Sequence, residues 1–331
     1  MPIPVSVIVC AHDEEQNLRE LVPQLLAQDY PDFEVIVVND RSNDATFDFL
    51  REASRFNPKL KVVQVEYLPP HANGKKYAIT LAMKTASNEV VLLTDADCRP
   101  NSPAWIASMA NRFTPDTQLV LGYSPYIKQP GFLNLFIRFE TLFTALQYVG
   151  LALAGMPYMG VGRNLAYRKS LFLENKGFRG YLDVTGGDDD LFVNRHATSK
   201  NTQVSLGADA LVMSIPKQTW REFLRQKTRH LRVGRFYKFG HRTVLGLFSL
   251  SQMVAWITGI YLLCTNPLIL WVLTPLLVRS ALFMITVYRF SVRVRHKFEA
   301  WTIPLLDFLF TIYYLSTGTV ALVSKKAQWK N

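Results

Sequence analysis

Two aspartates separated by a single residue follow an apolar run in LLTDADCRP, residues 92–100. If this run continues as a β-strand, Asp95 and Asp97 point to the same side, where their negative charges repel each other. Hard divalent cations such as Mg²⁺ and Mn²⁺ bind carboxylate oxygens and often bridge them to a substrate diphosphate. Such a cation neutralises the charge that develops on a leaving diphosphate. The pair therefore predicts a divalent metal site and leaves the choice between Mg²⁺ and Mn²⁺ open.

The chain of 331 residues carries a formal net charge of +11. A large positive net charge is typical of proteins that bind nucleic acid, an anionic membrane surface or phosphorylated substrates. The most basic segment, QKTRHLRVGRFYKFGHR at 226–242, precedes a long apolar run. No module of stacking aromatic residues accompanies it, which argues against nucleic acid and favours anionic lipid headgroups. Cys10, Cys98 and Cys264 are far apart and predict neither a disulfide framework nor a zinc site.

Short β-branched runs alternate with helical patterns through the first hundred residues. The expected strands are Val5–Cys10, Glu34–Asn39, Lys61–Glu66 and Val90–Thr94, and the expected helices are Glu14–Gln28, about 43–56 and Lys75–Thr85. This alternation predicts an α/β fold with a mostly parallel sheet and helices on both faces. Ligands of such sheets bind beyond the carboxyl ends of the strands. Asp13, Asp40, Asp95 and Asp97 should gather there, although each alone also fits a turn or a helix cap.

Six ordered segments resemble the motifs of glycosyltransferase family 2, whose catalytic domain has the Rossmann-like GT-A fold. They are VSVIVCAHDEE, VVNDRSND, GKKYAIT, TDADCRP, GGDDDLFVNRH and QKTRH, found between residue 3 and about residue 230. The chain departs from the usual family residues at Cys10, His12, Asp13, Asn39, Thr80, Gly187 and His230. The six segments together are specific for the family and say little about the substrate.

The resemblance implies a set of donor-binding residues. They are Ala11, Asp13, Asp40, Lys75, Lys76, Asp95, Arg163, Gln226 and Arg229. Asp40 would hydrogen-bond the nucleotide base, expected to be uracil, while Ala11 and Asp13 would line the base and ribose pocket. Gln226 and Arg229 would cap the active site near the diphosphate from a helix at the membrane interface.

The same resemblance gives roles to the lysine pair and to the metal motif. Lys75 or Lys76 would face the diphosphate, and either could instead be a solvated residue in the first turn of a helix. Asp97 would be the main metal ligand, and Asp95 would bind the ribose or reach the metal through water. Arg163 and the adjacent asparagine in GVGRNLAYRKSLF, residues 160–172, would contact the donor sugar.

The segment GGDDDL, residues 186–191, supplies the candidate base. Inverting transfer needs a group that takes a proton from the acceptor hydroxyl as this hydroxyl attacks the anomeric carbon. The family motif places Asp188 on the base and Asp190 on a second acidic position, although Gly187 replaces the usual glutamate. As an alternative, Asp188 or Asp190 caps the helix LFVNRH and leaves catalysis to the other.

Three apolar runs near the carboxyl end, Val244–Cys264, Pro267–Tyr288 and Thr302–Ser324, have about the length of a bilayer-spanning helix. The basic loop 289–300 between the last two predicts a cytosolic position for itself and for the catalytic domain. The basic tail KKAQWKN would then lie outside, so the third run could instead be re-entrant or interfacial. Arg279 and Asp307 inside the runs are expected to pair. The run 132–155 carries charges and should lie as a helix on the membrane surface.

The sequence thus predicts a nucleotide-sugar-binding half of a GT-A domain at 1–125, an acceptor-binding half with interfacial helices at 126–243, and a membrane domain with two to three transmembrane helices at 244–331. We expect a multi-pass cell-membrane enzyme that transfers a sugar with inversion from a nucleoside-diphosphate sugar, with UDP favoured. The acceptor would be a hydroxyl of a lipid-linked molecule or a glycan. The alternatives are a subunit of a processive polysaccharide synthase and a non-catalytic membrane scaffold. The sugar and the oligomeric state are not given by the sequence.

Overall fold

The computed structural model describes residues 2–70, 72–182, 184–265 and 269–323. The chain forms two compact units, and each is discontinuous in sequence. Unit 1 contains Met1–Ile127 and Gln147–Pro216, and unit 2 contains Lys128–Leu146 and Lys217–Gln328.

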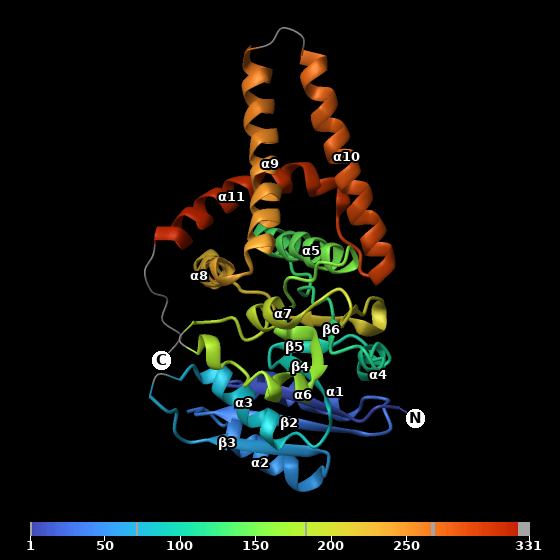
Figure 1. The fold of residues 1–331 in the computed structure, drawn as a ribbon, viewed down its shortest axis with the longest axis vertical. Coiled ribbons are helices and arrows are strands. Elements are labelled where there is room, and N and C mark those ends of the chain that lie inside the picture. The colour runs from blue at the N-terminus through green and yellow to red at the C-terminus, as the bar shows by residue number, and fades with distance from the viewer. Residues whose placement is uncertain (1, 71, 183, 266–268, 324–331) are drawn as a thin grey trace. The chain divides into compact units, whose positions relative to one another are not determined.

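A seven-stranded sheet with the order β3-β2-β1-β4-β7-β6-β8 forms the centre of unit 1 (Figure 1). Its strands are β1 (Val5–Ala11), β2 (Phe33–Asp40), β3 (Leu60–Val65), β4 (Val90–Asp95), β6 (Leu119–Leu121), β7 (Leu165–Arg168) and β8 (Thr202–Val204). Strands β1 to β4 are parallel to one another, β6 is parallel to β8, and β7 runs antiparallel to its neighbours β4 and β6. The predicted mostly parallel α/β sheet is therefore confirmed.

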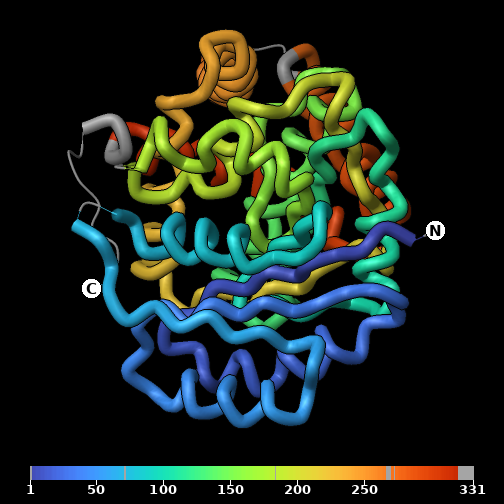
Figure 2. The backbone as a smooth tube through the Cα atoms, turned by 60° about the horizontal axis from the view of Figure 1, so that its bottom comes forward, coloured from blue at the N-terminus to red at the C-terminus, as the bar shows by residue number. Residues whose placement is uncertain are grey.

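Helices cover both faces of this sheet, which explains why its central strands are apolar on both sides. Figure 2 shows α3 (Gly74–Thr85) on one side of the strands and α1 (Glu15–Leu26) and α2 (Thr46–Phe56) on the other. Val5, Val7 and Val9 of β1 point toward α1 and share one apolar core with its buried leucines. The predicted helices lie where they were expected, with ends shifted by a few residues.

Shorter elements complete unit 1. These are α4 (Trp105–Ala110), α6 (Lys169–Glu174), α7 (Asp190–His196) and a two-stranded sheet of β5 (Cys98–Pro100) and β9 (Val212–Ser214). The antiparallel pairing of β5 with β9 follows directly after the turn that ends β4. It therefore fixes the carboxyl end of β4, where the predicted metal motif lies.

Unit 2 is built from helices. They are α8 (Trp220–Val233), α9 (Phe239–Thr265), α10 (Ile269–Val294), α11 (Ile303–Val323) and the first two-thirds of α5 (Phe132–Leu153). Helices α9 and α10 lie side by side as a hairpin, and α11 runs across them (Figure 1). Among the described residues, α9 and Leu273–Val294 of α10 are long and apolar enough to cross a membrane. The tail KKAQWKN and the end residues Pro267 and Ser324 of the predicted runs lie outside the described part of the chain.

Buried charges inside unit 2 are paired. Arg279 and Asp307 form a bidentate ion pair, in which Nη2 of Arg279 lies 3.2 Å from Oδ1 of Asp307. The predicted pairing is therefore confirmed. On α5, Arg138 lies 3.0 Å from Glu299, and Glu140 contacts the ammonium of Lys227. Arg138 and Glu140 are only 5% and 7% exposed. Their charges therefore serve contacts within unit 2 and do not form a polar surface of α5.

Candidate active site

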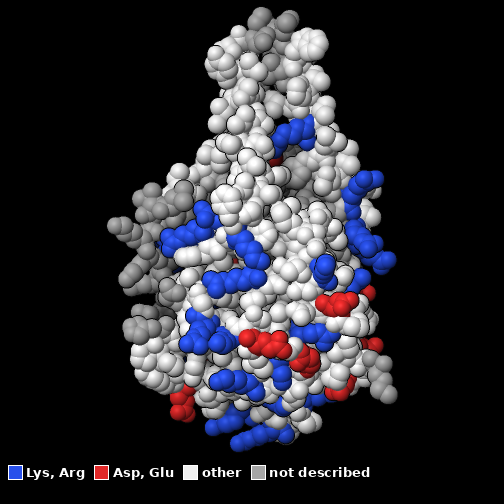
Figure 3. Space-filling model, viewed as in Figure 1, with Lys and Arg blue, Asp and Glu red and all other residues white. Residues whose placement is uncertain are grey.

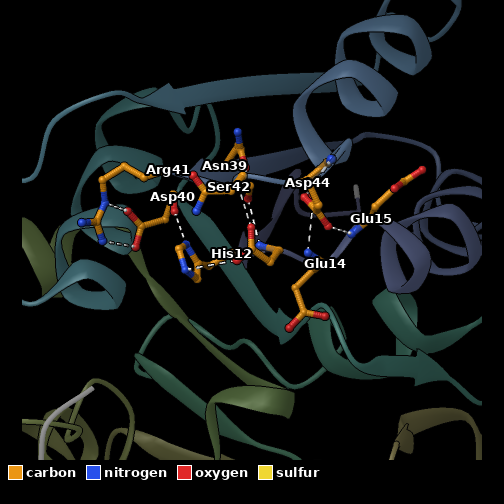
Figure 4. A network of polar contacts seen from close by, with 11 residues as sticks. His12, Glu14, Glu15, Asn39, Asp40, Arg41, Ser42 and Asp44 are labelled. Atoms are coloured by element: carbon orange, nitrogen blue, oxygen red, sulfur yellow. Dashed lines mark hydrogen bonds and ion pairs between the residues drawn. The ribbon is translucent and has the colours of Figure 1, made fainter. Parts of the chain in front are cut away.

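The loops that follow β1 and β2 interlock at one edge of the sheet (Figure 4). The Asp13 carboxylate accepts a 2.6 Å hydrogen bond from the backbone N–H of Asn43, and the Ser42 hydroxyl accepts one of 2.9 Å from the N–H of Asp13. Asp44 accepts a hydrogen bond from the N–H of Glu15, the first residue of α1. Asp13 has a positive φ of 55°, a conformation that aspartate tolerates better than most residues. Asp13 therefore joins the two loops, in addition to any contact with a ligand.

Asp40 ends β2 and is 5% exposed. Its carboxylate accepts hydrogen bonds of 2.8 and 3.3 Å from the guanidinium of Arg41, and its carbonyl oxygen lies 2.6 Å from Nδ1 of His12. A Cβ at Gly74 would come within 2.5 Å of Asp40 Oδ2, so only glycine allows this approach. Ala11 is buried in the adjacent strand, paired with Asn39. The predicted base-binding residues thus lie together, with Arg41 as a partner that the sequence reasoning missed.

The two lysines at the start of α3 point to different surroundings. Lys75 Nζ lies 2.9 Å from Asp95 Oδ1 and 3.2 Å from Asp188 Oδ2. Burial alone would lower the pKa of Lys75, but the charges of Asp188 and Asp95 outweigh it and hold this pKa well above its usual value. Lys76 is fully buried, and its ammonium donates to the carbonyls of Tyr181 and Val184. Lys75 is therefore the lysine that lies among the carboxylates.

The metal motif departs from the expected strand geometry. Asp95 is the last residue of β4, whereas Asp97 lies in the turn between β4 and β5, so the alternation expected of a continuous strand is wrong. Ala96 is buried, while Asp95 and Asp97 are each partly exposed at the same edge. The carbonyl of Asp97 accepts a hydrogen bond from the N–H of Ile215, which ties the turn to the segment after β9.

The carboxylate oxygens at this edge are suitable ligands for a hard cation that also binds the phosphate oxygens of a substrate. No group of three or more His, Cys, Asp or Glu residues that could hold a metal ion occurs within the described residues. Mg²⁺ and similar ions commonly bind one or two carboxylates and take their other ligands from water and phosphate oxygens. The two partly exposed carboxylates of Asp95 and Asp97 suit this kind of site, and they do not suit a closed structural metal site.

The acidic loop before α7 gives each aspartate a different environment. Asp188 is 8% exposed and pairs with Lys75. Asp189 caps α7, because its carboxylate accepts 2.7 Å hydrogen bonds from the N–H groups of Asp190 and Gly162. Burial and the charge of Asp188 raise the pKa of Asp189. The idea that Asp188 or Asp190 caps the helix is therefore wrong: Asp189 does so, and Asp190 lies in the first turn.

Gly187 has a structural reason to differ from the glutamate that is usual in the family. Its φ is 78°, which strains residues with a side chain, and an added Cβ would come within 2.6 Å of Leu191 Cδ1. The backbone of this loop therefore requires glycine next to Asp188.

Arg163 lies at the same edge as the metal motif. Its guanidinium stacks 4.5 Å from the ring centre of Tyr126, and its Nη1 is buried without a hydrogen-bond partner among the described residues. Burial alone would lower the pKa of Arg163, but nearby groups, with Tyr126 first and Asp97 and Asp95 among them, raise it. Asn164 is fully buried and bonded to Trp105 and to two carbonyls, so its side chain serves the protein interior.

Gln226 and Arg229 lie on α8 in unit 2. Both are partly exposed, and Lys227 between them is 8% exposed and bound to Glu140. Their roles at the donor stay predictions.

Cys10 and Cys98 lie near the carboxylates of unit 1 as free thiols, and burial raises the pKa of both. Burial therefore favours the neutral thiol of both residues at neutral pH.

Comparisons with known proteins agree with this fold and these motifs. The model of glycosyl transferase family 2 matches residues 6–172, and that of glycosyl transferase family group 2 matches residues 90–314. The chain is 27% identical over 241 residues to the probable glycosyltransferase YdaM of Bacillus subtilis, covering 69% of this chain and 54% of that protein. It is 30% identical over 93 residues to the poly-beta-1,6-N-acetyl-D-glucosamine synthase of Staphylococcus epidermidis, covering 28% of this chain and 21% of the synthase. The chain thus spans about half or less of the length of these relatives.

A solved structure shares the fold. The mannosyltransferase PcManGT of Pyrobaculum calidifontis, in complex with GDP-Man and Mn²⁺, superposes with a TM-score of 0.63 at 18% sequence identity, covering 98% of this chain and 89% of that one. The mostly parallel sheet and the order of the motifs along the chain are those of the GT-A fold. The chain belongs to glycosyltransferase family 2.

Proposed function

We propose that this glycosyltransferase is anchored in the cell membrane and transfers a sugar, with inversion, from a UDP-sugar to the hydroxyl of a lipid-linked or glycan acceptor. The observation that carries the proposal is the position of Lys75 between Asp95 of the donor motif and Asp188 of the acidic loop. One ammonium touches both carboxylates, so the groups proposed for donor binding and for proton transfer lie within a single cluster. In this assignment residues 1–125 bind the nucleotide sugar, and residues 126–243 bind the acceptor.

Asp188 is the proposed general base. Its carboxylate would take the proton of the acceptor hydroxyl while the hydroxyl oxygen forms the new bond to the anomeric carbon. The bond from that carbon to the diphosphate breaks on the opposite face, which gives inversion. Lys75 would keep its charge throughout, since the surrounding carboxylates raise its pKa, and it could follow the negative charge onto the diphosphate. Asp190 is the proposed second acidic residue.

The proposed donor pocket runs along the ends of β1, β2 and β4. Asp40, Ala11 and Asp13 would hold the base and ribose, and Arg163 would offer its unpartnered Nη1 to the donor sugar. Asp97, with Asp95, would hold Mg²⁺ or Mn²⁺, and this ion would neutralise charge on the departing diphosphate. GDP-Man and Mn²⁺ in PcManGT belong to the same classes of donor and ion. Gln226 and Arg229 are assigned to the diphosphate side of the pocket.

Membrane anchoring rests on the hairpin of α9 and α10. Both helices are long enough to cross a bilayer, and exposed apolar residues cover them, among them Leu247, Ile257 and Leu282. A soluble protein rarely exposes so large an apolar surface. The positive-inside rule places the basic loop after α10 in the cytosol together with the catalytic unit, where nucleotide sugars are made. An acceptor that reaches such an enzyme from the bilayer would be lipid-linked.

Calorimetry tests the donor site directly. The detergent-purified protein is titrated with UDP in the presence and absence of Mn²⁺ or Mg²⁺, beside the variant Asp97→Ala. The proposal expects binding that depends on the ion and that disappears in the variant. Absence of UDP binding with either ion would overturn the assignment of UDP and of the metal motif. A panel of UDP-sugars then identifies the sugar through product formation.

A second candidate is a subunit of a processive polysaccharide synthase. The similarity to a poly-beta-1,6-N-acetyl-D-glucosamine synthase favours it, although the match covers only 93 residues. The length of the product separates the two candidates. A single added sugar at limiting acceptor supports single transfer, whereas a ladder of products from one acceptor supports polymerisation.

A further inference from the structure

One end of the α9–α10 hairpin is strongly basic. Arg235, Lys238 and Arg242 are exposed around the start of α9, and Arg289 and Arg293 are exposed around the end of α10. In Figure 3 the hairpin surface beyond this end is almost free of charge. Lys and Arg concentrate on the cytosolic side of membrane proteins, so the basic end marks that side of the hairpin.

Helix α11 meets the hairpin well away from its basic end. Asp307 on α11 is 1% exposed, and its carboxylate accepts hydrogen bonds from Gln252 (2.8 Å) and Trp256 (2.9 Å) of α9 and from Arg279 of α10. Gln252 and Trp256 lie near the middle of α9, which at 27 residues is about 40 Å long. A hydrocarbon core about 30 Å thick that contains the apolar part of this hairpin also contains the level of Asp307.

The two sides of α11 differ in what covers them. One side packs within unit 2, where Phe310 contacts Phe143 of α5 and Tyr313 stacks on Phe223 of α8. The other side exposes apolar residues, with Leu305 59%, Ile312 50% and Leu315 41% exposed. Helix α11 runs across the hairpin helices (Figure 1), which themselves expose apolar residues such as Leu247 and Leu282.

We propose that α11 is a membrane-immersed helix that does not cross the bilayer, and that its exposed side contacts acyl chains of the cytosolic leaflet. A helix that crosses two spanning helices cannot follow the bilayer normal itself. Trp301, 78% exposed just before α11, and Tyr288, 65% exposed near the end of α10, suit the interface on that side. This placement keeps both ends of α11 on the side of the basic loop. Asp307 holds the helix in place through its bonds to both hairpin helices.

Spin labels measure the depth of α11 directly. Single cysteines replace Leu305, Ile312 and Leu315 in a Cys264→Ser background of the full chain, reconstituted in bilayers of phosphatidylcholine and phosphatidylglycerol. Accessibility to oxygen and to a nickel chelate gives the depth of each label. The proposal expects similar depths at Leu305 and Leu315, whereas a spanning helix would separate these two positions by about 15 Å. Depths that differ by this amount would overturn it.

Leu277 and Tyr288 on α10 are the matched controls, since both are exposed and lie at a comparable spacing on a helix proposed to span. A depth difference of about 16 Å between them is expected. If the controls show no difference, the hairpin does not span, and both membrane anchoring and the placement of α11 fail. If the controls differ and the α11 labels also differ, only the placement of α11 fails.

A sidedness measurement provides a second test. A cysteine in place of Lys326 is exposed to a membrane-impermeant maleimide in spheroplasts and in inverted vesicles, beside Arg295→Cys in the basic loop. We expect the cysteines at both positions to be labelled in inverted vesicles and neither to be labelled in spheroplasts. Labelling of the Lys326 position in spheroplasts, with the Arg295 position still protected, would mean that α11 crosses the membrane. Neither test depends on which sugar is transferred.

Discussion

Lys75 on α3 and Asp188 in the loop before α7 form an ion pair, with Nζ 3.2 Å from Oδ2. The Asp188 side chain is 9% exposed, and that of Lys75 is 22% exposed. Without the ammonium of Lys75, the buried carboxylate of Asp188 would carry an uncompensated charge, which is costly in the protein interior. The pair therefore links α3 to the acidic loop before α7.

Replacement of Lys75 by glutamine should lower the free energy of unfolding by roughly 3 kcal/mol, because Asp188 and Asp95 would then face each other without the ammonium. Thermal unfolding of the detergent-purified protein measures the loss. Lys84→Gln at the exposed end of the same helix is the control and should change stability by less than about 0.5 kcal/mol. Equal shifts in the two variants would contradict the importance of the pair.

Asp188→Asn should reduce turnover by about 10² to 10⁴-fold, since the amide cannot accept the proton of the acceptor hydroxyl. Donor affinity should stay close to that of the wild type. Radiolabelled sugar transfer and UDP calorimetry measure the two quantities. Asp190→Asn is the comparison: full activity of Asp188→Asn together with an inactive Asp190→Asn would move the base to Asp190.

Gly187→Ala should destabilise the acidic loop by about 1–3 kcal/mol, because alanine is strained at a φ of 78° and its Cβ meets Leu191. Gly131→Ala is a matched control, since its φ is also positive but nothing lies within 4 Å of the added carbon. Turnover should fall further in Gly187→Ala than in the control, because Asp188 is the next residue. A variant of Gly187 with unchanged stability and turnover would show that the loop adapts freely.

Acid stability should depend on Glu299. Burial alone would raise its pKa, but hydrogen bonds from Lys128 and Arg138 outweigh this and lower the pKa from 4.5 to about 2. A carboxyl whose pKa is lower in the folded protein contributes stability above pH 4.5, and this contribution disappears as the pH falls toward 2. The wild type should lose up to about 3 kcal/mol over this range through Glu299. Unfolding of the wild type and Glu299→Gln between pH 6 and 2 tests this, with convergence at low pH as the expected result.

The Arg279–Asp307 pair should be needed for the packing of α11. Asp307→Ala leaves Arg279 and the Gln252 and Trp256 donors without their acceptor, so we expect a loss of about 3–5 kcal/mol. The exchange Arg279→Asp with Asp307→Arg should recover part of this loss compared with either single change. Resistance to proteolysis in detergent reports the effect. An exchange variant as unstable as the singles would argue against a direct pairing.

Local sequence patterns were sufficient to predict the strands of the central sheet. The runs of Val, Ile and Leu in β1, β2 and β4 are apolar on both faces, as expected of parallel strands covered on both sides, and the acidic residues mark the strand ends. The pairing of Arg279 with Asp307 was also predictable, because charges inside apolar runs need a partner.

The features that the sequence did not predict depend mostly on contacts between segments that are distant along the chain. The turn at Asp97 depends on the pairing of β5 with β9, more than a hundred residues later, which no local pattern reveals. The different surroundings of Lys75 and Lys76 depend on Tyr181, Val184 and Asp188. The cap at Asp189 does have a local signal, since this aspartate directly precedes the helix that it caps. Arg41 also had a local signal, because a cation directly follows the aspartate at the end of β2.

The two charges of α5 constrain the order in which the protein can fold during synthesis. Arg138 and Glu140 leave the ribosome long before Glu299 and Lys227, their partners in unit 2. Until those segments have been made, the helix carries an apolar surface together with unmatched charges, and neither water nor lipid suits the whole of it. The ion pairs of this helix can therefore form only after α8 and the loop after α10 have been translated.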